Sequence, residues 1–261
     1  MLLRALASVA GQSFTDFEIV LVDDGSSDGS LDAAESYLSG KGLGFKSVRL
    51  PRNVGIPAAR NASVAAAGGS VAAFLDSDDA WHPHYLSIVQ AAYAAAKPPL
   101  FVSTDYLSDG PSYSGPVKQF DPPRAPFDSI ELMITRPFIH TMSCFSAPMA
   151  HLVAVGGFNE KLPRFSDLDL YIRLLGAAES ATGGDLRGAQ HVHIPQVGVL
   201  KSIHLESRRL ADYERDWEAG KNKFLETIFK YPFMRSRQNL REESAQALAR
   251  GQERFFDNFR G

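Results

Sequence analysis

Cysteine is nearly missing from this sequence of 261 residues, in which Cys144 is the single thiol. One thiol excludes an internal disulfide and any metal site built from several cysteines, and it suits a reducing compartment. A metal ion, if the protein uses one, must therefore be bound through Asp, Glu or His.

Long apolar runs are missing as well, since none approaches the roughly 18–20 residues that a membrane-spanning helix needs. We therefore expect a cytoplasmic protein, either soluble or in peripheral contact with the inner face of the membrane. The opening residues hold too short an apolar run before Gly11 to fit a secretion signal. The spacing of Leu2, Leu6 and Val9 instead predicts an amphipathic helix over residues 1–11.

A charge excess of one sign is also lacking, because the formal net charge is only −3. This balance gives no reason to expect a nucleic-acid partner. The length favours one α/β domain with an appendage. We assign residues 1–207 to the domain, with halves at 1–106 and 107–207, and residues 208–261 to a helical C-terminal extension.

Apolar runs and helical stretches alternate along the first half of the chain. The runs predict strands at residues 17–22, 45–50 and 71–75, with helices between them at 31–38 and 58–67. This alternation predicts a parallel sheet, whose ligands bind at the carboxyl ends of its strands. We therefore expect the acidic loops after the first and third strands to meet at one edge.

Beyond residue 85 the pattern is looser. We predict helices at 85–96, 167–175 and from 212 to the end with a break at Pro232, strands at 100–106, 139–147 and within 190–204, and a loop or hairpin at 107–126.

The segment VDDGSSDGS, residues 22–30, follows the first predicted strand. In one interpretation it is a turn whose Asp and Ser side chains cap the next helix, which is the commoner role of such residues. In the other, a carboxylate at the strand end accepts hydrogen bonds from a nucleobase or ribose.

The segment FLDSDDAW places Asp76, Asp78 and Asp79 directly after the third predicted strand. Crowded carboxylates are unfavourable unless a cation or hydrogen-bond donors neutralise them, and oxygen ligands suit Mg²⁺ or Mn²⁺. In an Asp-X-Asp arrangement, one carboxylate can bind a metal that bridges to a diphosphate, while the other orients ribose or a metal-bound water.

Two later segments also carry candidate residues. Within residues 156–174, Asp167 and Asp169 are either first-turn acids favoured by a helix dipole or include a general base that faces a cleft. His204 ends the segment KSIH and is structural unless it reaches the metal site, where imidazole can supply another ligand.

Taken together, these segments resemble the family 2 glycosyltransferases from about residue 5 to residue 207. The resemblance is carried, in order, by GQSFTDFEIVLVDDGSSDGS, RNVGIPAARNASVAAAGGSVAAFLDSDDAW, GGFNEKL, SDLDLYIRL and KSIH. It implies an α/β GT-A fold, in which residues 1–106 bind a nucleotide-sugar and residues 107–207 bind the acceptor.

The same resemblance implies roles for individual residues. The nucleotide-sugar would be bound by Asp24, which would contact uracil, and by Arg60 and Asp76. Asp78 and His204 would be metal ligands for Mn²⁺ or Mg²⁺.

Asp167 aligns with the catalytic base of the family. Two features of the chain, one beside Asp167 and one at the start of the sequence, depart from the family pattern. Ser166 stands where the family commonly has an acid, which changes how the acceptor is positioned. In addition, the chain begins at the helix that follows the family's first strand. Since that strand lies inside the sheet, its loss would leave two ladders unpaired, and we predict that the natural protein begins upstream of Met1.

These observations predict an inverting, metal-assisted transfer of a sugar from a UDP-sugar to a hydroxyl on a glycan or lipid-linked polysaccharide precursor. A sugar-phosphate nucleotidyltransferase is an alternative, because it shares a related sheet and metal site. An inactive, truncated binding protein is another. The segment at residues 156–174 favours the transferase.

Overall fold

The computed structural model describes residues 1–95, 99–109, 130–135, 139, 141–182, 187–202 and 210–260. The elements of the first half are α1 (Leu2–Ala10), β1 (Ile19–Asp23), α2 (Ser30–Gly40), β2 (Phe45–Arg49), α3 (Ile56–Ala66), β3 (Val71–Ala73), β4 (Ala80–Trp81), α4 (Tyr85–Tyr93) and β5 (Phe101–Asp109). The remaining elements are α5 (Ile130–Thr135), η1 (Met142–Cys144), β6 (Phe145–Pro148), α6 (Met149–Ala154), α7 (Ser166–Ser180), β7 (His191–Ser202), α8 (Leu210–Ile228), η2 (Pro232–Arg237) and α9 (Leu240–Arg260).

The first half follows the predicted alternation of helices and strands. β1 and β2 pair in parallel, from Ile19 opposite Phe45 to Asp23 opposite Arg49. This confirms the predicted parallel pairing for the first two strands. In the described ladders β3 pairs antiparallel with β6 and not with β1 or β2.

Five strands form the larger sheet, in the order β3-β6-β5-β7-β4. β5 and β7 are parallel, whereas the other three pairings are antiparallel. The α/β class is confirmed, but the expectation of a mainly parallel sheet does not hold for these five strands. The alternation of helices and strands along the chain predicts only local structure. The position of β6 between β3 and β5 depends on contacts between residues that are distant in sequence.

In the described ladders, β1 and β3 each have a single partner. β2 and β4 likewise have one partner each, so each of the two described sheets ends in an edge strand on both sides.

The later elements differ from the sequence prediction at two places. The strand expected at 139–147 begins only at Phe145, because Met142–Cys144 forms a 3₁₀ turn in which the Thr141 side chain accepts a hydrogen bond from Ser143 N–H. β7 is a single strand whose register with β5 is irregular around Asp105. The loop predicted at 107–126 begins later than expected, since β5 continues to Asp109, and its remainder lies outside the described residues.

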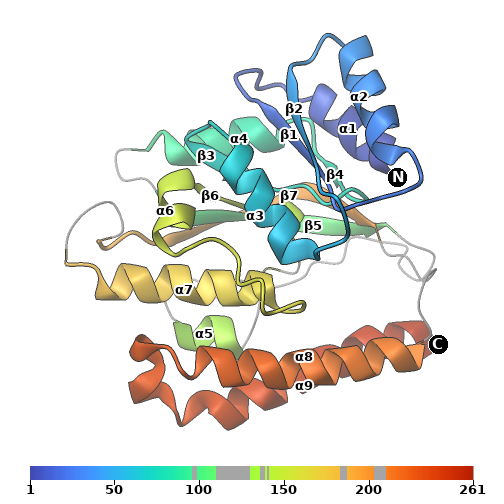
Figure 1. Cartoon of the computed structure of the whole chain (residues 1–261). Coiled ribbons are helices and arrows are strands. Elements are labelled where there is room, and N and C mark those ends of the chain that lie inside the picture. The colour runs from blue at the N-terminus through green and yellow to red at the C-terminus, as the bar shows by residue number, and fades with distance from the viewer. Residues whose placement is uncertain are drawn as a thin grey trace.

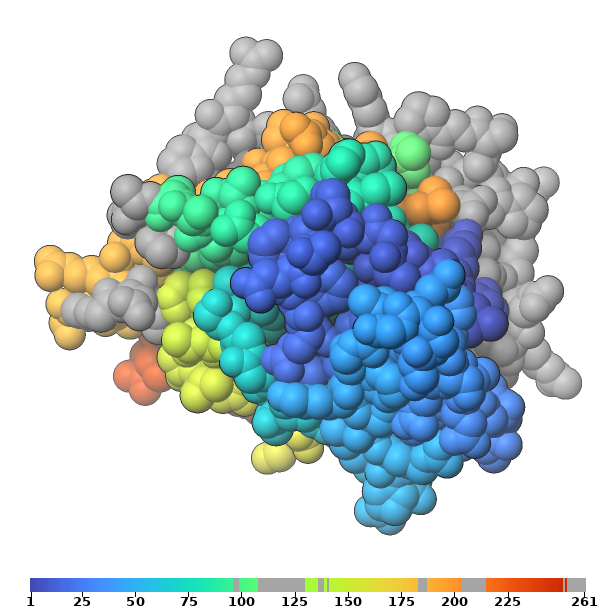
Figure 2. Space-filling model, turned by 90° about the horizontal axis from the view of Figure 1, so that it is seen from above, coloured from blue at the N-terminus to red at the C-terminus, as the bar shows by residue number. Residues whose placement is uncertain are grey.

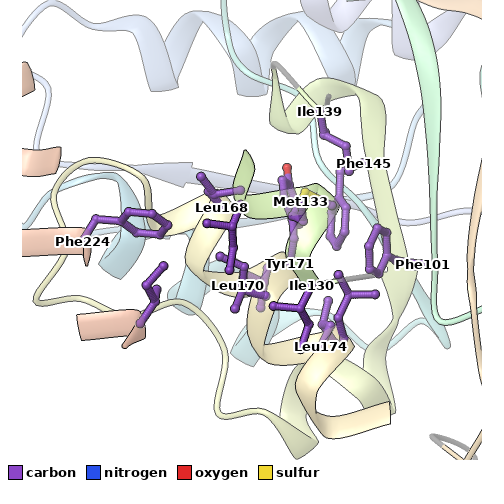
Figure 3. Packing of buried hydrophobic residues seen from close by; sticks show 14 of the residues in the cluster. Phe101, Ile130, Met133, Ile139, Phe145, Leu168, Leu170, Tyr171, Leu174 and Phe224 are labelled. Atoms are coloured by element: carbon purple, nitrogen blue, oxygen red, sulfur yellow. The ribbon is translucent and has the colours of Figure 1, made fainter. Parts of the chain in front are cut away.

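The main core lies between the larger sheet and the helices below it (Figure 1). Phe101, Phe145 and Tyr171 form an aromatic group in this core, with ring centroids 4.9–5.8 Å apart. Figure 3 shows that Phe224 of α8 extends into the same cluster next to Leu168 of α7. The C-terminal extension therefore shares the core of the domain.

The C-terminal extension is helical and breaks at Pro232, as predicted, since η2 begins there. α8 and α9 run side by side along the underside of the molecule, with α5 and α7 above them (Figure 1). On the opposite face, seen from above in Figure 2, residues of the N-terminal half gather around the centre. Within the described part of the chain, no helix has the length and apolar character needed to cross a membrane.

Candidate functional site

Helix α3 begins beside the carboxylate of Asp24. This carboxylate accepts hydrogen bonds from the backbone N–H groups of Val54, at 2.7 Å, and Gly55, at 2.9 Å. Gly25 lies so close to the second loop that a Cβ atom there would be 2.6 Å from the carbonyl carbon of Arg52, and its φ is +76°. The loops that follow β1 and β2 are therefore held together at the N-terminus of α3.

Arg60 connects the same helix to the acidic loop after β3. Its guanidinium lies 2.8 Å from Asp76 Oδ1, and 16% of the Arg60 side chain and 38% of the Asp76 side chain are exposed. Gly55 and Arg60 are five residues apart, which is about 7–8 Å along a helix axis. The two acidic loops thus meet at α3, as predicted, although the helix rather than a continuous parallel sheet joins them.

Asn61, the next residue of α3, binds a third loop. Its Nδ2 donates to the Phe158 carbonyl oxygen at 2.9 Å and to Glu160 Oε1 at 2.8 Å, while its Oδ1 accepts from Phe158 N–H at 2.7 Å. Gly157 leaves room for this contact, because a Cβ atom there would lie 2.5 Å from Asn61 Oδ1. Asn61 was not among the predicted site residues, although its place directly after Arg60 was the available signal.

Asp79 is a structural member of the acidic loop. It is 2% exposed and accepts hydrogen bonds from Thr141 Oγ1 at 3.0 Å, Ser143 Oγ at 2.7 Å and Ser202 N–H at 3.0 Å. Donors from the segment before β6 and from the end of β7 therefore hold this carboxylate. Of the three crowded carboxylates, that of Asp79 is therefore stabilised by these hydrogen-bond donors.

Asp76 and Asp78 are both half-buried. The backbone fixes their positions, because Asp76 N–H donates to Ser143 Oγ at 3.0 Å and Arg4 donates to the Asp78 carbonyl oxygen at 2.8 Å. Two carboxylates on a fixed, accessible loop suit Mg²⁺ or Mn²⁺, since such ions commonly bind one or two carboxylates together with substrate phosphates.

A complete metal cage is not formed by the described residues alone, among which no three His, Cys, Asp or Glu side chains gather as a group that could hold an ion. His204, the other predicted ligand, lies outside the described residues. The donor set of Asp76 and Asp78 therefore fits an ion that substrate oxygens complete.

The two acids at the start of α7 have different surroundings. Asp169 is fully buried, and its carboxylate binds the Arg173 guanidinium at 2.8 Å and accepts from the Tyr231 hydroxyl at 2.6 Å. Asp167 is half-buried, and its Oδ1 accepts from Leu168 N–H at 2.8 Å. Asp169 is thus committed to the fold, whereas Asp167 retains an accessible carboxylate.

Tyr171 of α7 lies in the main core, and its hydroxyl donates to Met142 Sδ at 3.1 Å. Burial raises the pKa of this phenol well above the usual 10.0, and the charge of Asp167 raises it further.

The family assignment rests on a sequence match. The family model described as "Glycosyl transferase family 2" matches residues 1–148. An uncharacterized glycosyltransferase of Nostoc sp. is 46% identical over 83 residues, which cover 32% of this chain and 26% of that protein. Chondroitin synthase of Pasteurella multocida is 29% identical over 171 residues, or 66% of this chain and 17% of the synthase. The chain thus spans about a quarter or less of these two relatives.

Solved structures with a similar fold include S. aureus TarS 1-349 in complex with UDP-GlcNAc, with a TM-score of 0.66 and 20% identity over 88% of this chain and 63% of that chain. The mannosyltransferase PcManGT from Pyrobaculum calidifontis, in complex with GDP-Man and Mn²⁺, has a TM-score of 0.61 and 17% identity over 95% of this chain and 69% of that chain. These likenesses show a GT-A-like fold. This family assignment argues against the nucleotidyltransferase alternative. Since the family model covers more than half of the 261 residues, the chain belongs to glycosyl transferase family 2.

Proposed function

We propose that this protein transfers a sugar from a UDP-sugar to a hydroxyl of a glycan or lipid-linked polysaccharide precursor, with inversion at the anomeric carbon. The observation that carries the proposal is the attachment of three loops to α3. Its N-terminus binds Asp24, Arg60 binds Asp76, and Asn61 binds the loop that leads toward Asp167. The proposed donor-binding acids and the loop that leads toward the proposed base are thereby attached to one helix.

Asp24 is proposed to bind the uracil ring. Each of its carboxylate oxygens accepts one backbone N–H, so each retains a lone pair for an N–H of the base. Val54, beside this carboxylate, is 44% exposed, and Ile56 is 59% exposed. An accessible acceptor bordered by apolar side chains suits a flat heterocycle with donor groups at its edge.

Arg60 and Asp76 are proposed to bind the rest of the nucleotide-sugar, with Asp78 holding Mg²⁺ or Mn²⁺. The ion would offset the negative charge that develops on the departing UDP. His204, placed near the diphosphate by the family resemblance, stays a proposed further ligand. Arg60 adds a fixed positive charge within 2.8 Å of Asp76, which keeps the loop in place before the donor binds.

Asp167 is proposed to accept the proton of the acceptor hydroxyl as the oxygen attacks. Its Oδ1 accepts a hydrogen bond from Leu168 N–H at 2.8 Å in the first turn of α7, and the side chain is half-buried. This hydrogen bond orients a carboxylate that stays accessible to an acceptor hydroxyl. The cytoplasmic location and the peripheral membrane contact predicted from the sequence belong to this proposal.

Titration of the protein with UDP, with and without Mn²⁺, tests donor binding. Asp78→Ala should abolish the metal-dependent part of the affinity, while Asp32→Ala, which removes an exposed acid on α2, should leave it unchanged. A parallel titration with GDP examines the preference for uracil. Unchanged metal-dependent binding in Asp78→Ala would remove this residue from the site. An inactive binding protein would instead bind UDP-sugar without releasing UDP in the presence of acceptor.

A further inference from the structure

We propose that the C-terminal extension positions the catalytic base, with Trp217 and Phe224 of α8 and Tyr231 as positioning residues. This inference rests on the proposed role of Asp167. The extension contacts the chain two residues before and two residues after Asp167, at Phe165 and at Asp169. Its function would therefore be to fix the direction in which the Asp167 carboxylate points.

Phe165 is the residue from which α7 starts, and its backbone is unusual. Its φ is 60° and its ψ is 19°, and it is the one non-glycine residue with positive φ in the described part of the chain. A bulky residue rarely adopts this left-handed conformation unless its surroundings hold it there. The first turn of α7 therefore depends on whatever holds Phe165.

Side chains of α8 hold the Phe165 ring. Trp217 meets it edge to face, with the ring centroids 5.1 Å apart, and the Phe224 ring lies 5.5 Å away. Phe224 is fully buried and extends toward Leu168, as Figure 3 shows. No ring contact of Phe165 outside α8 is recorded among the described residues, so the aromatic support for this conformation comes from the extension.

The sequence of α8 is suited to this contact. Trp217, Gly220 and Phe224 follow one another at intervals of three and four, which places them on one face of the helix. Gly220 is buried, and a Cβ atom there would lie 2.9 Å from Cβ of Arg164. A glycine inside a helix is intrinsically unfavourable, and here it allows α8 to approach the residues that precede α7.

Tyr231 provides the second contact, on the other side of Asp167. Its hydroxyl donates to Asp169 Oδ1 at 2.6 Å, while Arg173 binds the other oxygen of the same buried carboxylate. Phe165 and Asp169 each lie two residues from Asp167, so the extension fixes the chain on both sides of the base. General-base catalysis depends on such precision, since a displacement of 1 Å can lower a rate by about 10²-fold.

Trp217→Ala tests the inference, and Arg237→Ala is the control. Both substitutions remove a contact of the extension with α7, but Arg237 binds Glu179, twelve residues after Asp167 and hence about 18 Å along the helix. In Trp217→Ala we expect kcat to fall by about 10- to 100-fold while KM for the UDP-sugar stays within about two-fold. Arg237→Ala should lower the thermal midpoint and leave kcat near that of the parent.

A second comparison separates this inference from the proposed function. Because Trp217 would act through the base, Trp217→Ala should cause no further loss of turnover in an Asp167→Asn background. A folded Trp217→Ala variant with the kcat of the parent would overturn the inference. Parent-like turnover of Asp167→Asn would instead overturn the proposed function. If Trp217→Ala does not fold, Tyr231→Phe tests the inference instead, because it keeps the ring and removes only the hydroxyl that donates to Asp169. A Tyr231→Phe variant with the kcat of the parent would then overturn the inference.

Discussion

Asp78 and Asp79 are adjacent carboxylates for which the structure predicts different effects of substitution. Asp79→Ala should destabilise the fold, because it removes the acceptor of three buried hydrogen bonds that join the acidic loop to the segment before β6 and to the end of β7. Asp78→Ala should abolish metal-dependent UDP binding with a smaller loss of stability, since its side chain is half-buried whereas that of Asp79 is fully buried.

The magnitude for Asp79 follows from the donors that would lose their partner. The Ser202 N–H is fixed in the backbone, and leaving such a buried donor unsatisfied costs about 1–3 kcal/mol. The hydroxyls of Thr141 and Ser143 can rotate toward other acceptors, so each adds less. We expect a total loss of about 2–4 kcal/mol in the free energy of unfolding. For Asp78→Ala we expect a loss of about 1 kcal/mol, which is typical of a single substitution.

Urea denaturation of the parent and both variants, followed by circular dichroism, measures these differences directly. UDP titration with Mn²⁺ on the same samples separates the loss of binding from the loss of structure. An Asp79→Ala variant within about 0.5 kcal/mol of the parent would refute the anchoring role of this carboxylate. A large loss of stability in Asp78→Ala would show that the functions of the two residues had been assigned the wrong way round.

Two further predictions concern other parts of the structure. Gly157→Ala should lower stability and weaken donor binding, because its φ is +68° and the new Cβ would lie 2.5 Å from Asn61 Oδ1. Thermal melting and UDP titration measure these two effects. Gly156→Ala is the control for backbone strain alone, since Gly156 also has a positive φ but has open space around it. Burial, reinforced by the neighbouring His193, holds the pKa of His191 well below its usual 6.5. The unfolded chain therefore binds more protons than the folded one below about pH 6.5, and stability should decrease as the pH falls, by up to about 1.4 kcal/mol per pH unit. Urea midpoints between pH 5 and pH 7.5 should show a smaller acid loss in His191→Gln, and an identical slope in that variant would contradict the assignment.

The sequence was sufficient to predict the order of elements through the first half, because strong apolar periodicity and glycine stops act locally. It also predicted the break at Pro232 and the meeting of the loops that carry Asp24 and Asp76. The pairing of β3 with β6 was not predictable, since strand partners are chosen by tertiary contacts that a local pattern does not record.

The carboxylates illustrate the same limit at the site. Asp76, Asp78 and Asp79 look alike in sequence, and so do Asp167 and Asp169. Partners from distant segments distinguish them: Ser202 comes from β7 and binds Asp79, while Tyr231 comes from the C-terminal extension and binds Asp169. The role of Asn61 was missed for the same reason, because its partners lie almost a hundred residues further along the chain.

Comparison of Asp167→Asn with the parent protein tests the proposed catalytic chemistry most directly. The asparagine keeps the size and one acceptor oxygen of the side chain, so UDP-sugar affinity should stay within a few-fold of the parent. Turnover with saturating donor and acceptor should fall by about 10²- to 10⁴-fold, which is the usual contribution of a general base. If Asp167 only caps α7, the same substitution would cost at most about 0.5–2 kcal/mol of stability. Turnover within a few-fold of the parent, in a folded and saturated protein, would contradict its role as the base.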